Sequence, residues 1–91
     1  MIILPKKSNS GWVVFFSGLP SNLSLYIIKF CLYHYSKKNI KYKIFLLFNK
    51  KNYSTGFVIL ENLYHCIFLI ECLNGLKIIN SVFNMSWAFI E

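Results

Sequence analysis

Two phenylalanines on predicted strands have the clearest binding chemistry in the chain. Phe15 lies in residues 12–16 and Phe57 in residues 53–60, and both runs combine apolar, β-branched and aromatic residues as strands do. Because side chains alternate between the faces of a strand, both rings are expected to point away from the buried side. Exposed rings on a flat sheet stack on unpaired bases, for about 1–3 kcal/mol per base. The pattern therefore predicts a stacking surface for single-stranded RNA.

Polar and basic side chains are expected around the two rings. Lys41 and Lys43 alternate with apolar residues on another predicted strand, and Lys50 and Lys51 lie in the loop that follows. Such lysines neutralise phosphates and release counterions, although a charged run also serves simply to keep an apolar domain soluble. The chain has no arginine, the residue that usually reads guanine with two hydrogen bonds. The other residues predicted on this RNA-binding face are Tyr53, Thr55, Asn84 and Ser86.

The two predicted helices carry apolar side chains on faces that are expected to meet solvent. An exposed apolar surface of this extent marks a site for a protein partner or a liability to aggregation. A third explanation is the composition, since the abundance of Phe, Ile, Lys, Asn and Tyr is typical of a genome rich in A and T. The residues predicted to bind a larger protein scaffold are Tyr26, Ile27, Phe30, Tyr33, Tyr64 and Phe68.

The sequence offers no recognisable catalytic or metal-binding constellation. It has no aspartate, its three glutamates make no plausible carboxylate pair, and it contains no glycine-rich phosphate loop. The three cysteines lack the short spacing of zinc ligands and are expected to be reduced thiols of the core. We therefore expect no enzyme activity, no metal, no cofactor and no small-molecule substrate. The acidic residues and cysteines are Glu61, Glu71, Glu91, Cys31, Cys66 and Cys72.

The elements that position these residues follow the order βαββαβ. Strand signals lie at residues 12–16, 40–48, 53–60, and 78–79 with 81–87. Ser24 is expected to cap a first helix. Asn62 is expected to cap a second helix, which Asn74 and Gly75 end. The order predicts an α+β fold of the ferredoxin-like kind, a sandwich with a four-stranded antiparallel sheet and two helices on one face.

The 91 residues have room for one small domain, and they carry a net charge of +7. Residues 1–11 are predicted to form a short polar arm, and residues 12–89 the domain. The longest stretch without charge, residues 8–28, contains too many Ser, Asn, Gly and Pro residues to span a membrane. The first residues also lack the pattern of a secretory signal. We therefore expect an intracellular protein with no membrane contact.

Three segments together resemble the RNA recognition motif family. In residues 14–20, Phe15 occupies the aromatic position of the hexamer that forms the family's first strand. Residues 53–60 contain a Gly-Phe-Val core that fits the octamer of the third strand. The Leu-Asn-Gly sequence of residues 73–75, followed by residues 83–88, is similar to the signature that closes these domains. The resemblance extends from about residue 12 to residue 88, which is most of the chain.

The resemblance implies non-catalytic binding of single-stranded RNA, with Phe15 and Phe57 as the stacking rings. Thr55 stands where the family usually has another ring. The layout is closest to small single-domain nuclear subunits, such as the spliceosomal branch-site subunit and the small cap-binding subunit. It thus implies a place in a nuclear ribonucleoprotein such as the splicing machinery. Since the fold also serves in protein binding, the alternative is an assembly subunit that contacts RNA weakly or not at all.

Overall fold

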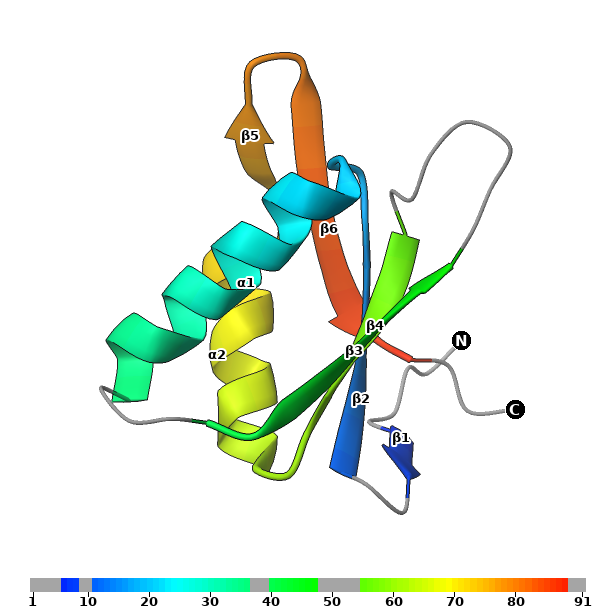
Figure 1. Cartoon of the computed structure of the whole chain (residues 1–91), viewed down its shortest axis with the longest axis vertical. Coiled ribbons are helices and arrows are strands. Elements are labelled where there is room, and N and C mark those ends of the chain that lie inside the picture. The colour runs from blue at the N-terminus through cyan, green and yellow to red at the C-terminus, as the bar shows by residue number, and fades with distance from the viewer. Residues whose placement is uncertain (1–5, 9–10, 37–39, 48–54, 89–91) are drawn as a thin grey trace.

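Two helices cover one face of an antiparallel sheet (Figure 1). The computed structural model describes residues 6–8, 11–36, 40–47 and 55–88. In these residues the chain has an α+β architecture, as predicted. The elements are β1 (Lys6–Ser8), β2 (Gly11–Ser17), α1 (Ser21–Ser36), β3 (Tyr42–Leu47), β4 (Thr55–Leu60), α2 (Leu63–Leu73), β5 (Leu76–Ile78) and β6 (Ser81–Trp87).

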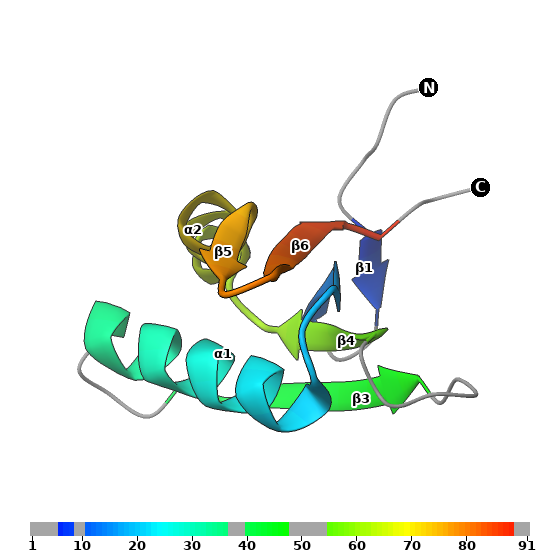
Figure 2. The ribbon, with the colours of Figure 1, turned by 90° about the horizontal axis from the view of Figure 1, so that it is seen from above.

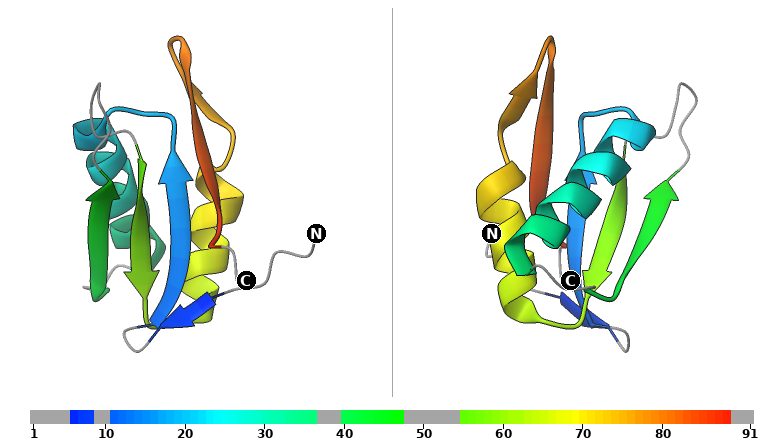
Figure 3. Two further views of the ribbon diagram at one scale, coloured as in Figure 1. Left: turned by 90° about the vertical axis from the view of Figure 1, so that its right-hand side faces the viewer. Right: turned by 60° about the vertical axis from the view of Figure 1, so that its left-hand side comes forward.

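The sheet has β2 and β4 near its centre. Five strands run side by side in the order β3-β4-β2-β6-β5, and every neighbouring pair is antiparallel. Four of them, β3-β4-β2-β6, lie at the four predicted strands, and the arrangement is compatible with a ferredoxin-like fold. The left view of Figure 3 looks onto these strands with the helices behind them. The strands that carry Phe15 and Phe57 are therefore direct neighbours.

The prediction of only four strands was wrong, because two short strands extend the sheet. β5 pairs with the start of β6 across a turn of Ile79 and Asn80, so Ile79 lies in the turn and not in a strand. β1 lies within the predicted arm and pairs with residues 11–13 of β2. It shares one edge of β2 with β6, since β4 occupies the other edge. Strands of three residues are too short to show a readable alternation.

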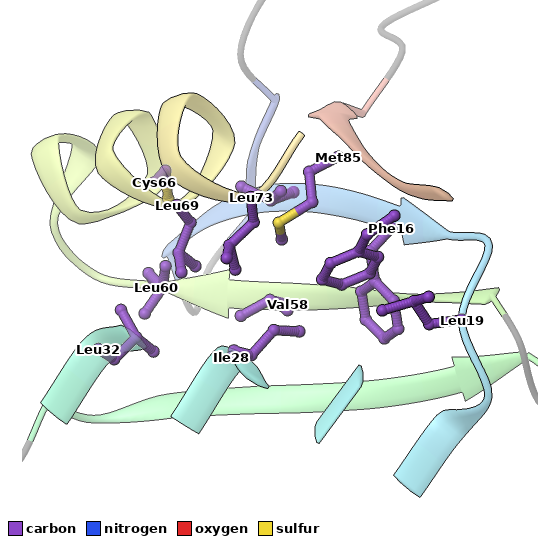
Figure 4. Close-up of a cluster of buried hydrophobic side chains, with 12 residues drawn as sticks. Phe16, Leu19, Ile28, Leu32, Val58, Leu60, Cys66, Leu69, Leu73 and Met85 are labelled. Atoms are coloured by element: carbon purple, nitrogen blue, oxygen red, sulfur yellow. The ribbon is translucent and has the colours of Figure 1, made fainter. Parts of the chain in front are cut away.

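The hydrophobic core lies between the sheet and the helices (Figure 4). Phe16 of β2 packs edge-on against Phe83 of β6, with ring centroids 6.0 Å apart. Seen from above, α1 lies toward β3 and α2 lies beside β5 (Figure 2), so the two helices cover different parts of this core. The buried core residues are Val14, Phe16, Leu19, Ile28, Leu32, Val58, Leu60, Cys66, Leu69, Leu73, Phe83 and Met85.

The start of α1 differs from the prediction that Ser24 caps it. The helix begins at Ser21, and Ser24 lies one turn inside it, fully buried. The Ser24 hydroxyl donates a hydrogen bond to the carbonyl oxygen of Leu19 at 3.3 Å, and its backbone N–H donates to that of Pro20 at 2.9 Å. The fixed φ of proline suits the start of a helix, so the chain turns into α1 directly after Pro20.

The ends of α2 are as predicted. The Asn62 side chain accepts a hydrogen bond from the backbone N–H of Tyr64 at 2.8 Å, which is N-capping geometry. At the other end Gly75 has a φ of 87°, which glycine adopts without strain. The Asn74 side chain accepts a hydrogen bond from the backbone N–H of Met85 at 3.0 Å. This last bond ties the end of α2 to β6.

Candidate functional site

Three phenylalanine rings lie in one row across three strands, on the face of the sheet opposite the helices. Phe57 of β4 is paired with Phe15 of β2 on one side and with Phe45 of β3 on the other. Residues paired in this way point to the same face. The rings of Phe15 and Phe57 meet edge to face, with centroids 5.6 Å apart and planes at 61°. We call Phe15, Phe57 and Phe45 the aromatic row.

The alternation predicted for the two central strands is confirmed. Val14, Phe16, Val58 and Leu60 are fully buried toward the helices. Phe15 and Phe57 are half-buried on the other face. Because no helix lies over this face in the described residues, the rings stay accessible to a ligand (Figure 3).

Phe45 is the member of the aromatic row that sequence analysis did not select. The signal was present, because Phe45 follows Lys41 and Lys43 at intervals of two along a predicted strand. Its ring is 51% exposed, the most open of the three. The register of β3 against β4 is what shows that Phe45 lies beside Phe57 rather than one position away.

The predicted polar neighbours also lie on this face. Ser86 of β6 is paired with Phe15 and so continues the aromatic row. Thr55 of β4 and Asn84 of β6 are both paired with Ser17, which places them in the next row of the same face. Thr55 and Ser86 are half-buried and Asn84 is exposed, so hydroxyl and amide groups border the rings.

The predicted lysines fall into two groups. Lys43 is paired with Ile59, one row from the rings, and Lys41 lies two residues before it; both are exposed. Together with Tyr42, Ile59 and Glu61 they line a shallow hollow of about 140 Å³. The sequence analysis did not place Glu61 at this site. The other predicted contacts, Tyr53, Lys50 and Lys51, lie outside the described residues.

A second surface, on the helical side, collects four of the six residues predicted to bind a protein. An apolar groove of about 460 Å³ runs between α1, α2 and β5, and we call it the helical groove. Ile27 and Phe68, predicted to face solvent, are in fact half-buried because they pack into its walls. Tyr33 and Tyr64 are 62% and 71% exposed but do not line it. The groove is lined by Tyr26, Ile27, Phe30, Cys31, His34, Phe68, Leu73, Leu76 and Ile78.

The cysteines differ from one another more than predicted. Cys66 is fully buried, and burial raises the pKa of its thiol to about 12. Cys31 is half-buried, and burial together with the neighbouring Cys72 raises the pKa of its thiol to about 11. Cys72 is exposed, so the prediction of three core thiols was wrong for this residue of α2. Raised pKa values keep Cys31 and Cys66 protonated and weakly nucleophilic at neutral pH.

The described residues contain no group of three or more His, Cys, Asp and Glu side chains that could hold a metal ion. Among the helices of the same residues, none has the length and apolar character needed to cross a membrane.

Comparison with known proteins does not assign the chain to a family. No model of a protein family matches the sequence, and no curated protein matches it either.

Proposed function

We propose that the protein binds single-stranded RNA, without catalysis, through the aromatic row. The observation that carries this proposal is the pairing of Phe15, Phe57 and Phe45 on a face without a helical cover. Every base has a π-face, so adjacent rings on a flat sheet bind successive unpaired bases with little dependence on sequence. Double-stranded nucleic acid does not offer its base faces in this way.

The charges on the same face support an RNA ligand. Lys43 lies on the edge strand beside the rings, and Lys41 lies directly before this strand; both are exposed to solvent, where they can neutralise phosphates. The chain as a whole carries a net charge of +7, which attracts a polyanion from a distance. Stacking and phosphate contacts therefore act on one strand at one site.

A place in a nuclear ribonucleoprotein, such as the splicing machinery, belongs to the same proposal. Its support is the sequence resemblance to the RNA recognition motif family, with a Phe at the expected position in each of the two central strands. The strand order β3-β4-β2-β6 agrees with the ferredoxin-like arrangement that the resemblance implies.

The test is binding of the purified chain to a randomised single-stranded RNA pool, measured by fluorescence anisotropy. The double variant Phe15→Leu/Phe57→Leu keeps apolar side chains of similar size but removes both π-faces. We expect it to weaken binding by about tenfold or more. Thermal unfolding of the variant, followed by circular dichroism, checks that the fold is retained.

The matched control also replaces two aromatic residues by leucine, but in the helical layer instead of the sheet. Tyr26 and Phe30 are a stacked pair on α1, with centroids 6.0 Å apart, and both are exposed. Tyr26→Leu/Phe30→Leu should leave RNA binding unchanged. Equal losses in the two double variants, or no RNA binding by the wild-type chain, would refute the proposal.

The alternative is an assembly subunit that docks a protein partner through the helical groove. The specific observation in its favour is that Tyr26 and Phe30 are 64% and 53% exposed beside this groove. Water-exposed aromatic surface of this kind is a feature of protein interfaces. Absence of RNA binding in the experiment above, with a correctly folded chain, would favour this alternative.

A further inference from the structure

We propose that the hollow beside the aromatic row is a base-recognition subsite that selects guanine. It is formed by Lys41, Lys43, Ile59 and Glu61, with Tyr42 completing its wall. The inference rests on the proposed function, since it concerns the next base of an RNA strand that lies on the rings. It adds a sequence preference to a face that otherwise binds by stacking.

The position of the hollow suits a base next to the aromatic row. Phe57 and Ile59 are two residues apart on the outer face of β4, and Glu61 follows directly after the end of this strand, where it lines the hollow together with Ile59. Same-face neighbours on a strand are about 7 Å apart. An RNA strand that stacks one base on Phe57 can therefore lay an adjacent base over Ile59, whose half-buried side chain is an apolar floor.

The polar groups around this floor match the edges of guanine. A carboxylate has two oxygens that accept hydrogen bonds side by side. The Watson–Crick edge of guanine presents two adjacent donors, N1–H and the N2 amino group, and its O6 and N7 atoms are acceptors for an ammonium group. On the Watson–Crick edge, adenine, cytosine and uracil each have an acceptor atom next to their single donor. Each of these bases would therefore place its acceptor against a carboxylate oxygen of Glu61, and the two would repel each other. The contact needs no arginine.

Glu61 is the acidic side chain that the described residues place beside the two lysines of the hollow. The chain has only three acidic residues, and the other one in the described residues, Glu71, lies on α2 in the opposite layer. A carboxylate near a phosphate backbone repels RNA unless the ligand donates hydrogen bonds to it. A carboxylate at this place therefore penalises bases that cannot donate twice, and this penalty is a source of specificity.

The experiment measures affinity for short uridine-rich RNAs that differ at one central base. We expect the wild-type chain to bind the RNA with a central guanine about tenfold more tightly than the RNA with uridine, adenine or cytosine there. Inosine lacks the N2 amino group and should lose most of this advantage. Glu61→Gln should abolish the preference for guanine while leaving affinity for the uridine RNA equal or slightly higher. Because Glu61 is exposed, the fold should tolerate the change.

Glu71→Gln is the matched control, because it removes the same charge from an exposed position on the other layer. It should leave the guanine preference intact. Binding of all central bases with equal affinity, or a preference for another base, would overturn the subsite while the stacking proposal stands. An equal gain for every RNA in Glu61→Gln would show that Glu61 acts only as a repelling charge. Failure of every RNA to bind would overturn both proposals.

Discussion

The three rings of the aromatic row differ in how far solvent reaches them. Phe57 has a ring neighbour on each side, and Phe15 lies between Phe57 and Ser86, so both are half-buried. Phe45 lies on the edge strand and is 51% exposed. A base has the most freedom to lie flat on the most exposed ring. We therefore expect Phe45 to contribute to RNA affinity as strongly as the two rings that the sequence predicted.

Replacing Phe45 tests this expectation directly. Phe45→Leu should weaken binding to the randomised RNA pool by about tenfold, because one stacked base is worth about 1–3 kcal/mol. Leu47→Ala is the control, since Leu47 is two residues further along the same face of β3 and 42% exposed but has no ring. Similar losses in the two variants would mean that β3 contributes apolar area and not stacking.

Cys66 gives a prediction for the pH dependence of stability. Its Sγ lies 3.9 Å from the carbonyl oxygen of Trp12 and is buried, and burial raises the pKa of the thiol from 9.0 to about 12. The folded chain therefore holds this proton to higher pH than the unfolded chain. The stabilisation is complete below pH 9 and is lost as the pH rises from about 9 to 12.

Urea denaturation at several pH values measures this effect. The free energy of unfolding of the wild-type chain should fall more steeply above pH 9 than that of Cys66→Ala, which has no thiol to ionise. The difference between the two should change by at most about 1.4 kcal/mol per pH unit, the limit for one proton. All other residues are the same in the two chains, so their contributions cancel in the comparison. A difference independent of pH would contradict the prediction.

At the scale of elements, the hairpin of β5 and β6 contains one unfavourable residue. Ile79 is in the two-residue turn and has a φ of 53°. Positive φ is rare for a β-branched residue, and the left-handed region costs about 1–2 kcal/mol for ordinary L-residues. The side chain is 94% exposed, so it gains almost nothing from burial in return.

Ile79→Gly should therefore stabilise the protein, because glycine adopts a positive φ without strain. Glycine also makes the unfolded chain more flexible, which offsets part of this gain, so the net stabilisation should be about 0.5–1 kcal/mol. Thermal unfolding should show a rise in Tm of a few degrees. Asn80→Gly is the matched control, because Asn80 is in the same turn and does not have a positive φ. It should lower the Tm or leave it unchanged. A lower Tm for Ile79→Gly would show that the turn is not strained.

The elements also show what could be predicted from sequence. Apolar, β-branched and aromatic runs identified β2 and β4, and an alternating run identified β3. The cap and stop of α2 were found from Asn62 and from Asn74 with Gly75. The three-residue strands β1 and β5 were missed, because their stability comes from pairing with distant residues and not from a local pattern. Phe45 and Glu61 were missed as site residues for a similar reason. Alternation assigned Phe45 to a face, but only the strand register places it beside Phe57.

On the scale of the whole molecule, the candidate surfaces lie on opposite sides of one core. Both helices lie on one side of the sheet (Figure 3). The aromatic row is on the other face, and the helical groove is lined by residues of α1, α2 and β5. An RNA strand and a protein partner could therefore bind at the same time. The net charge of +7 acts on both surfaces, so overall attraction must be separated from contacts at one site.

The salt dependence of RNA binding separates attraction by the overall charge from phosphate contacts at the aromatic row. Each phosphate contact contributes about 0.7 to the slope of log affinity against log salt concentration for single strands. Lys43 lies beside the aromatic row, whereas Lys29 is also exposed but lies on α1 in the other layer. Lys43→Gln should lower the slope by about 0.7, and Lys29→Gln should leave it unchanged. If attraction came only from the overall charge, the two variants would lower affinity equally and change the slope alike.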